Sequence, residues 1–217
     1  MLITGSSSSA IEHVISSLSK QFSLKDLGEV KHFLGVEVTQ TAQGLHLSQG
    51  SYIKNIIERV KMQDAKGLPT PMLANLKLSN DEGDPTIDGK LYRSTVGALQ
   101  YATLTRPEIS YVVNMVSQFM ACPLDSHWKA VKRILRYLAS SVGYGIHIQA
   151  SHTNLIAFSD SDWASDIDDR RSVTGYCVFL GKNLISWCSK KQPGVSRSST
   201  LRLNTGVLLR LSVMSLG

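Results

Sequence analysis

The sequence predicts a mixed α/β (α+β) fold, and three patterns lead to this expectation. Apolar residues recur at helical spacing between residues 52 and 138, which predicts several amphipathic helices. From Asn154 onward the period changes to two, which predicts strands. A shorter alternating stretch within residues 32–49 predicts a β-hairpin. We therefore expect domain boundaries near residues 50 and 150.

Residues 1–50 are expected to contain a strand, a helix and the hairpin. Met1 to Gly5 is a short strand-like run. Ser9 and Glu12 have the spacing of a capping box, and apolar residues follow at helical spacing: Ile11, Val14, Ile15, Leu18 and Phe22. In the hairpin, apolar residues alternate on both sides of Gly44: Leu34, Val36, Val38, Leu45 and Leu47.

Residues 51–150 are expected to be helical. A first helix should span about residues 52–61, and a long connection rich in Pro and Gly follows over residues 66–90. Three more helices should cover about residues 91–104, residues 105–120 and a segment that starts near Asp125 or Ser126. Thr105 and Glu108 have the spacing of a second capping box.

Residues 151–200 are expected to hold three strands, LIAFSDSDW, SVTGYCVFL and LISWCSKK, the last two joined around Gly181. The character of the chain then changes. Residues 201–217 contain no Asp, no Glu and no aromatic residue, and show no clear period. We treat them as a separate tail.

The composition limits the class of protein. The chain has 217 residues, of which 42% are hydrophobic, which is enough for a packed core. A net charge of +6 favours an acidic partner such as nucleic acid. Cys122, Cys177 and Cys188 lack metal-binding spacing and indicate a reducing compartment. No apolar run reaches the roughly 18 residues of a membrane span. We expect an intracellular protein, cytoplasmic or nuclear, with no membrane partner.

The stretch FSDSDWASDIDDRR is the strongest candidate for chemistry because it carries five aspartates: Asp160, Asp162, Asp166, Asp168 and Asp169. Ala164, Ser165 and Arg171 occupy positions where an EF-hand needs its own ligands and glycine, which excludes that site. The carboxylates are either solvated loop side chains or the start of a two-metal nuclease site, which needs further carboxylates from later elements. We expect Asp160 and Asp162 not to serve one ion together.

A basic stripe lies on the expected third helix of the central region, opposite its apolar face. Its members are spaced i, i+3, i+4 and i+7: Lys129, Lys132, Arg133 and Arg136. Such a stripe is either an ordinary solvated face or a surface that follows a phosphate backbone. A weaker basic cluster near the end of the strand region contains Lys190, Lys191 and Arg197.

Several blocks resemble the Pol polyprotein of copia-type retrotransposons. They are FSLKDLGEVKHFLGVEV, GLHLSQGSYI, YRSTVGALQYATLTRPEISYVVNMVSQFM, HWKAVKRILRYL, AFSDSDWASDIDDRRSVTGYCVFLG and ISWCSKKQPGVSRSS. The blocks occur in the family's order from residue 1 to Thr200. The resemblance covers nearly the whole chain except the tail.

The resemblance implies a reverse-transcriptase palm remnant with its hairpin (1–50), a helical thumb and connection (51–150) and an incomplete RNase H-like sheet (151–200). The hairpin would belong to the part of the palm that grips the primer. The family places its polymerase aspartates before a strand like MLITG, so they would precede Met1. Asp160 matches the first RNase H aspartate, with Asp162 the less favoured match. The resemblance implies Mg²⁺ as the cofactor, held weakly by one carboxylate.

The tail, residues 201–217, is expected to be out of frame. After SRSST the family continues E-A-E-Y-R, whereas this chain has Leu201 to Gly206, LRLNTG. One permitted set of codons is CTG AGG CTG AAT ACC GGT. Read from its third base, this set encodes E-A-E-Y-R. The first Glu of that peptide would be the second RNase H carboxylate, which a frameshift would remove.

We therefore expect a fragment of a retrotransposon reverse transcriptase/RNase H polyprotein, catalytically inactive by itself, that binds the backbone of an RNA–DNA hybrid through the basic stripe. The first alternative is an active Mg²⁺-dependent RNase H-type nuclease that uses the cluster from Asp160 to Asp169. The second is a helical interaction module adopted by the host, with no nucleic-acid role.

Overall fold

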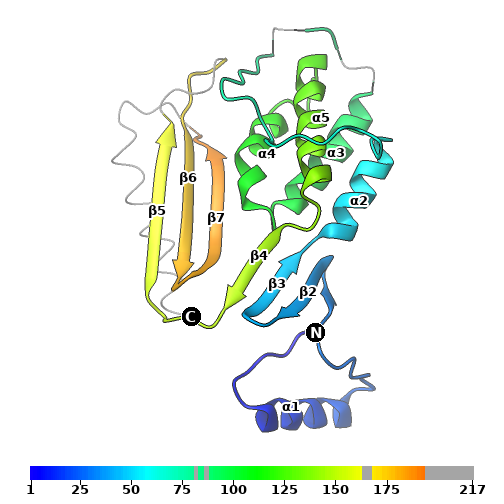
Figure 1. The fold of residues 1–217 in the computed structure, drawn as a ribbon, viewed down its shortest axis with the longest axis vertical. Coiled ribbons are helices and arrows are strands. Elements are labelled where there is room, and N and C mark those ends of the chain that lie inside the picture. Colours follow the sequence, from blue (N-terminus) through cyan, green and yellow to red (C-terminus); the bar gives the residue numbers. More distant parts are fainter. Residues whose placement is uncertain (81–82, 86–87, 163–167, 194–217) are drawn as a thin grey trace.

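The computed structural model describes residues 1–80, 83–85, 88–162 and 168–193. The fold is mixed, with a helical layer that has one antiparallel sheet beside it and a second antiparallel sheet at its lower end in Figure 1. The first sheet has the order β1-β2-β3-β4 and the second the order β5-β6-β7. This confirms the expected class at the level of mixed helices and strands.

The first sheet contains the expected hairpin and one strand that the sequence analysis missed. Its strands are β1 (His32–Phe33), β2 (Val36–Thr41), β3 (Gly44–Ser48) and β4 (Gly145–Gln149). β4 pairs with β3, with Leu47 opposite Ile146. Gly44 is required at the turn because its φ is +148° and an added Cβ would lie 2.1 Å from the carbonyl of Ile148. The strand β4 thus returns the chain to the hairpin after 96 intervening residues, which contain the helices.

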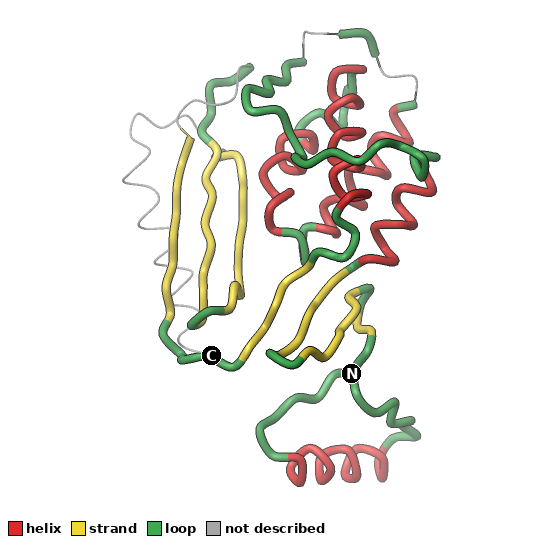
Figure 2. The backbone as a smooth tube through the Cα atoms, in the orientation of Figure 1, coloured by secondary structure: helices red, strands yellow, loops and turns green. Residues whose placement is uncertain are grey.

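The helical layer follows the predicted periodicity closely. It comprises α2 (Gly50–Arg59), α3 (Gly89–Ala102), a 3-10 turn η1 (Pro107–Ile109), α4 (Ser110–Ser117) and α5 (Asp125–Ser140). Their apolar faces form one core that includes the fully buried Ile53, Val96, Leu99, Val116, Ile134, Leu135 and Leu138. The connection between α2 and α3 runs across these helices as an irregular segment (Figure 2).

The helix starts differ from the predicted caps. The residue that precedes η1 is Arg106, which makes no side-chain cap, and the Thr105 hydroxyl donates to Gln49 Oε1 at 2.9 Å. Glu108 instead accepts from Arg106 Nε at 2.6 Å. The predicted capping box is therefore wrong, and a 3-10 turn precedes α4. At the start of α5, the ring Nδ1 of His127 accepts a hydrogen bond from the Leu124 N–H at 3.0 Å. This bond satisfies a backbone N–H that the helix leaves unpaired.

The second sheet confirms the three strands predicted after Asn154. They are β5 (Leu155–Asp162), β6 (Val173–Leu180) and β7 (Asn183–Lys191), all antiparallel. Gly181 forms the tight turn between the last two at a φ of +59°. β7 packs against α4, and the Trp187 indole N–H donates to the Thr103 carbonyl at 3.1 Å. The sheet therefore presents one face to the helices.

The N-terminal segment differs most from its predicted structure. α1 (Ser8–Gln21) forms as predicted, but its cap is the Ser7 hydroxyl, which accepts from the Ala10 N–H at 3.4 Å, so the capping box at Ser9 is wrong. None of its residues is buried, and α1 stands apart from the helical layer (Figure 1). Residues 1–5 form no strand because no described segment supplies the paired backbone groups that a strand requires.

Candidate nucleic-acid interface and carboxylate cluster

The basic stripe lies on α5, opposite the residues that enter the core. The sequence places it there because buried positions of α5 recur at helical spacing: Ala130, Val131, Ile134, Leu135 and Leu138. Lys129 and Lys132 are exposed. The ammonium of Lys132 lies 5.7 Å from the centroid of the Trp128 ring, and this contact steadies its otherwise mobile side chain.

The two arginines of the stripe have a different role. Arg133 Nη2 donates to the Thr70 hydroxyl at 2.7 Å, and Arg136 Nε donates to the Lys66 carbonyl at 2.6 Å. Both hold the connection between α2 and α3 against α5. The structure thus divides the stripe into two exposed lysines and two half-buried arginines that bind the protein itself.

The second basic cluster is divided in the same way. Lys190 is exposed on β7. Lys191 forms an ion pair with Asp169, with 2.9 Å between Nζ and Oδ2. Arg197 lies outside the described residues. Within the part of the chain that the structure describes, Lys190 is therefore the exposed member of this cluster.

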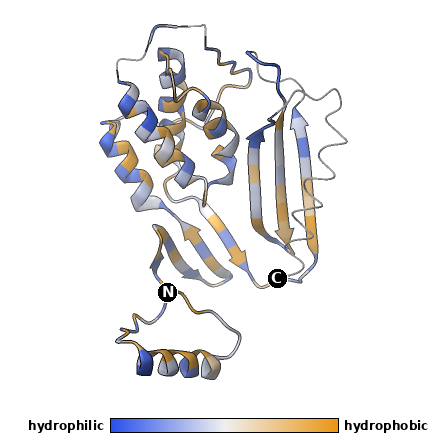
Figure 3. Cartoon of the chain, turned by 180° about the vertical axis from the view of Figure 1, so that it is seen from behind, coloured by the Kyte–Doolittle hydropathy of each residue, from blue (hydrophilic) through white to orange (hydrophobic). Residues whose placement is uncertain are grey.

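Asp160 and Asp162 lie at the end of β5, where the strand changes from apolar to polar, as Figure 3 shows by its change from orange to pale and blue. Both are exposed. Residues two apart in a strand share one face, so the expectation that they could not serve one ion together is wrong. The Asp160 carboxylate accepts from the adjacent backbone N–H of Ser161 at 2.7 Å.

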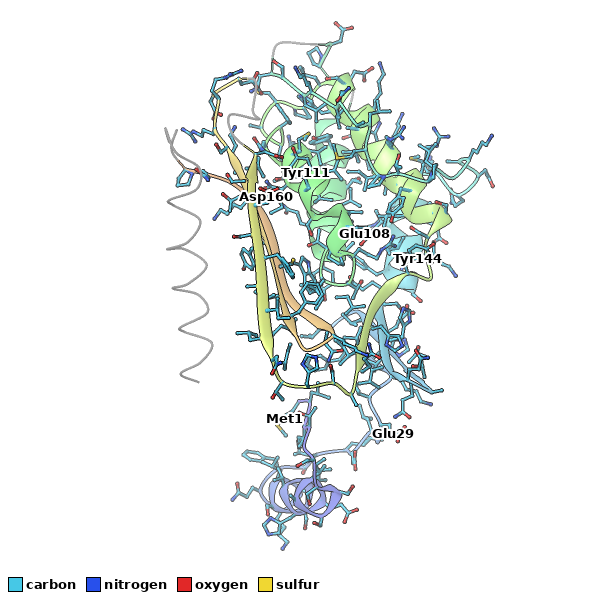
Figure 4. All side chains as sticks on the ribbon, turned by 60° about the vertical axis from the view of Figure 1, so that its left-hand side comes forward. Met1, Glu29, Glu108, Tyr111, Tyr144 and Asp160 are labelled. Carbon is cyan, nitrogen blue, oxygen red and sulfur yellow. The ribbon has the colours of Figure 1, made fainter. Side chains whose placement is uncertain are left out.

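Asp162, at the end of β5, acts electrostatically on a tyrosine of α4. Burial raises the pKa of the Tyr111 hydroxyl above its usual value, and the negative charge of Asp162 raises it further. Figure 4 labels Asp160 on β5 and Tyr111 on α4. Asp162 at the end of β5 is thus close enough to Tyr111, in the first turn of α4, for its charge to act on that hydroxyl.

The later aspartates are used by other contacts. The Asp168 carboxylate accepts from the Ser79 hydroxyl at 2.7 Å, and from the backbone and side-chain N–H groups of Asn80 at 3.1 and 2.7 Å. Asp169 pairs with Arg171 and Lys191. Asp166 lies outside the described residues. Among the residues described, no three His, Cys, Asp or Glu side chains gather closely enough to hold a metal ion.

The first sheet carries a polar face that the sequence analysis did not identify. His46 lies directly opposite His147, with 6.4 Å between ring centroids, and Thr41 Oγ1 is 3.2 Å from His147 Nε2. Glu37 accepts from the Ser51 N–H at 2.7 Å, and this hydrogen bond is the main reason that the pKa of its carboxyl is lowered. Period-two spacing could have revealed this face in the hairpin, but not its continuation into the unpredicted β4.

Comparisons with known proteins found one family and several relatives. A family model described as "Reverse transcriptase (RNA-dependent DNA polymerase)" matches residues 1–74. The Pol polyprotein from transposon RE2 of Arabidopsis thaliana is 47% identical over 201 residues, which is 92% of this chain and 14% of that protein. The Pol polyprotein from transposon TNT 1-94 of Nicotiana tabacum is 40% identical over 209 residues, which is 92% of this chain and 16% of that protein.

A shorter relative is matched over most of its length. An uncharacterized mitochondrial protein of Arabidopsis thaliana is 46% identical over 202 residues, which is 92% of this chain and 83% of that protein. No solved structure matches the chain at a significant level. No helix in the described residues has the length and apolar character to cross a membrane. The chain spans only about a seventh of the transposon polyproteins it matches.

Proposed function

Because the chain belongs to the family of copia-type retrotransposon Pol polyproteins, which contain a reverse transcriptase, we propose that it binds the backbone of an RNA–DNA hybrid. The surface that makes this contact is α5, with Lys129 and Lys132 facing the phosphates. Reverse transcriptases bind nucleic acid generally, and the duplex is recognised by its shape and charge rather than by its bases.

The observation that carries the proposal is the contrast within the basic stripe. Lys129 and Lys132 are exposed and, among the described residues, take part in no ion pair, so their charge is available to a ligand. Arg133 and Arg136 fix the neighbouring connection and keep α5 in place. Because α5 is held in place, binding of a polyanion has to order only the side chains of the two lysines and not their backbone.

Under the same proposal, each region of the chain is assigned to the part of the Pol polyprotein that it resembles. Residues 1–50 correspond to the end of a palm, residues 51–150 to a thumb and connection, and residues 151–200 to the start of an RNase H-like domain. The antiparallel order of β5, β6 and β7, with Asp160 on the first strand, supports the last assignment.

We further propose that the chain does not hydrolyse nucleic acid by itself. Reverse transcriptases generally use divalent metal ions, and Asp160 with Asp162 would be the side chains that offer oxygen ligands to Mg²⁺. The described residues do not fit a two-metal site, because Asp168 is bound by Ser79 and Asn80, and Asp169 is bound by Arg171 and Lys191. Two exposed carboxylates leave Mg²⁺ mostly hydrated.

A salt titration of binding tests the main proposal. We would measure the dissociation constant of an RNA–DNA hybrid by gel shift at several salt concentrations, for the wild type and for Lys129→Ala/Lys132→Ala. Losing two phosphate contacts should make the slope of log affinity against log salt shallower by about 1 to 2. The matched control, Lys54→Ala/Lys90→Ala, removes the same charge from exposed sites on α2 and α3. Equal weakening by both pairs would overturn the proposed surface.

The nuclease alternative is tested on the same hybrid. We expect the RNA strand to remain intact after incubation with Mg²⁺. Cleavage that Asp160→Asn abolishes, and that Asp26→Asn does not, would replace the proposal of an inactive chain by that of an RNase H-type nuclease. Asp26 is a suitable control because it is exposed in the loop after α1.

A further inference from the structure

A pocket lies between the helical layer and the second sheet. Figure 1 shows β7, the strand that lines it, on the side of its sheet nearest to α4. Its volume is about 470 Å³, which is within the usual range of small-molecule pockets. Its walls come from the end of α3, from one side of α4 and from the middle of β7. None of these residues belongs to the basic stripe or to the aspartate cluster.

Three polar atoms that line this pocket are buried without a hydrogen-bond partner among the described residues. They are Ser110 Oγ and Asn114 Nδ2 from α4 and Ser189 Oγ from β7. Buried polar groups are normally paired, because an unpaired group loses its hydrogen bonds to water. Three unpaired groups that meet in one pocket from two elements indicate a ligand that hydrogen-bonds to all of them.

The remaining walls favour a flat, largely apolar ligand. Val113 and Ile185 supply aliphatic contacts, and Trp187 contributes its indole ring. The indole N–H is already used, since it donates to the Thr103 carbonyl at 3.1 Å. Trp187 therefore offers ring surface rather than a hydrogen bond.

We propose that this pocket binds one unpaired nucleobase of a single-stranded nucleic acid. A base combines a planar aromatic face, which packs on an aromatic side chain, with an edge of acceptors and donors. Asn114 supplies a donor, and the hydroxyls of Ser110 and Ser189 can each donate or accept. The inference rests on the proposed nucleic-acid function and adds a second, base-contacting site to the backbone surface on α5.

The experiment uses mononucleotides, which isolate the base from the rest of a strand. We would titrate AMP, CMP, GMP and UMP to about 10 mM and follow saturation transfer from the protein to the ligand protons by NMR, with ribose 5-phosphate as the ligand without a base. We expect transfer to at least one mononucleotide, stronger at its base protons than at its ribose protons. We expect none to ribose 5-phosphate.

Two variants locate the binding site. Asn114→Leu and Ser189→Ala each remove one hydrogen bond, so each should weaken mononucleotide binding roughly fivefold to tenfold. Asn55→Leu makes the same change at an exposed position of α2 and should leave binding unchanged. Asn114→Leu should also raise the melting temperature of the free protein, because it removes an unpaired buried donor. This readout confirms that the variant is folded.

Three results would overturn the proposal that the pocket binds a nucleobase: no transfer to any mononucleotide, equal transfer to ribose 5-phosphate, or unchanged mononucleotide affinity in Asn114→Leu. These results differ from a failure of the proposed duplex surface. Lys129→Ala/Lys132→Ala should lower hybrid binding and leave mononucleotide binding intact. Asn114→Leu should have the opposite pattern.

Discussion

The guanidinium of Arg106 is buried and hydrogen-bonded to Ser141, the residue that ends α5. Nη1 donates to the Ser141 carbonyl at 2.9 Å and Nη2 to its hydroxyl at 2.6 Å, while the Arg106 side chain is only 1% exposed. Arg106 precedes η1, and Ser141 caps α5 just before β4. One side chain thus joins the start of α4 to the return of the chain into the first sheet.

Removing this side chain should destabilise the fold strongly. Arg106→Leu leaves the Ser141 carbonyl and hydroxyl without their donors and removes the partner of Glu108, so we expect a loss of about 3 kcal/mol in the free energy of unfolding. Urea denaturation measures this change. Arg59→Leu on the exposed side of α2 is the control and should change stability by less than about 0.5 kcal/mol. Similar losses in both variants would show that the buried hydrogen bonds of Arg106 do not stabilise the fold more than an exposed arginine does.

His127 should make stability depend on pH. Its Nδ1 accepts from the Leu124 N–H, and its Nε2 lies 3.0 Å from the Ser79 carbonyl oxygen. In the folded protein these contacts fit the neutral ring with its proton on Nε2. The ring is fully buried and stacks on Phe119 with 3.8 Å between centroids. Burial is the main reason that the pKa of His127 lies below its usual 6.5.

The direction of the pH effect follows from this lowered pKa. The unfolded chain binds a proton on His127 at a higher pH than the folded chain does, so stability is lost as the pH falls below about 6.5. The slope attributable to this group is at most about 1.4 kcal/mol per pH unit. We expect His127→Gln to flatten the stability curve between pH 7.5 and 5.5, and His13→Gln on α1 to leave it unchanged. An equally steep curve in His127→Gln would exclude His127 as its cause.

The aspartates should separate into a structural and an exposed group. Asp168→Ala removes the acceptor of the Asn80 backbone N–H, so hydrogen exchange at Asn80 should become faster by about tenfold. Asp160→Ala should leave exchange at Asn80 unchanged, because Asp160 contacts Ser161 beside it. Mass spectrometry of peptides from residues 75–80 measures the rate. Unaltered exchange in Asp168→Ala would argue that the 79–80 segment is held by other contacts.

The sequence predicts secondary structure correctly where the pattern lies within one helix or strand. It fails where the structure depends on contacts with residues far along the chain. The helices, the hairpin and the three late strands follow from local periodicity. β4 was missed because GIHIQ is short and follows a helix, and its identity as a strand comes from pairing with β3. The predicted cap at Thr105 failed for the same reason, since Thr105 bonds to a residue 56 positions away.

The candidate site shows the same limit. Sequence spacing places all four basic residues of α5 on one side of the helix, but it cannot show that the connection returns over two of them. It likewise cannot distinguish Asp160, which is exposed, from Asp168, which Ser79 and Asn80 bind. The pocket beside α4 depends on two elements separated by about seventy residues, and nothing in either segment alone predicts it.

The arginines and lysines of α5 should therefore differ in their effect on stability. Arg136→Ala removes the hydrogen bond to the Lys66 carbonyl and the packing of its half-buried stem, so we expect a loss of about 1 to 2 kcal/mol. Lys129→Ala, at an exposed position of the same helix, should change stability by less than about 0.5 kcal/mol. Thermal denaturation of both variants measures the difference. If the two variants melted alike, the division of the stripe would be wrong.

The exposed side chains of β5 should limit solubility. Phe158 is 60% exposed and Ile156 is 45% exposed on the same face of a strand at the edge of its sheet. An apolar edge of this kind promotes association between copies of the chain. Phe158→Ser should raise the concentration at which light scattering detects association. Its cost in stability should be below about 1 kcal/mol, because the side chain loses mainly its edge contact with Phe179.

Leu27→Ser, which changes an 83% exposed loop residue, is the control and should leave the threshold unchanged. An equal shift in the control would mean that general surface hydrophobicity, rather than the edge of β5, sets the threshold.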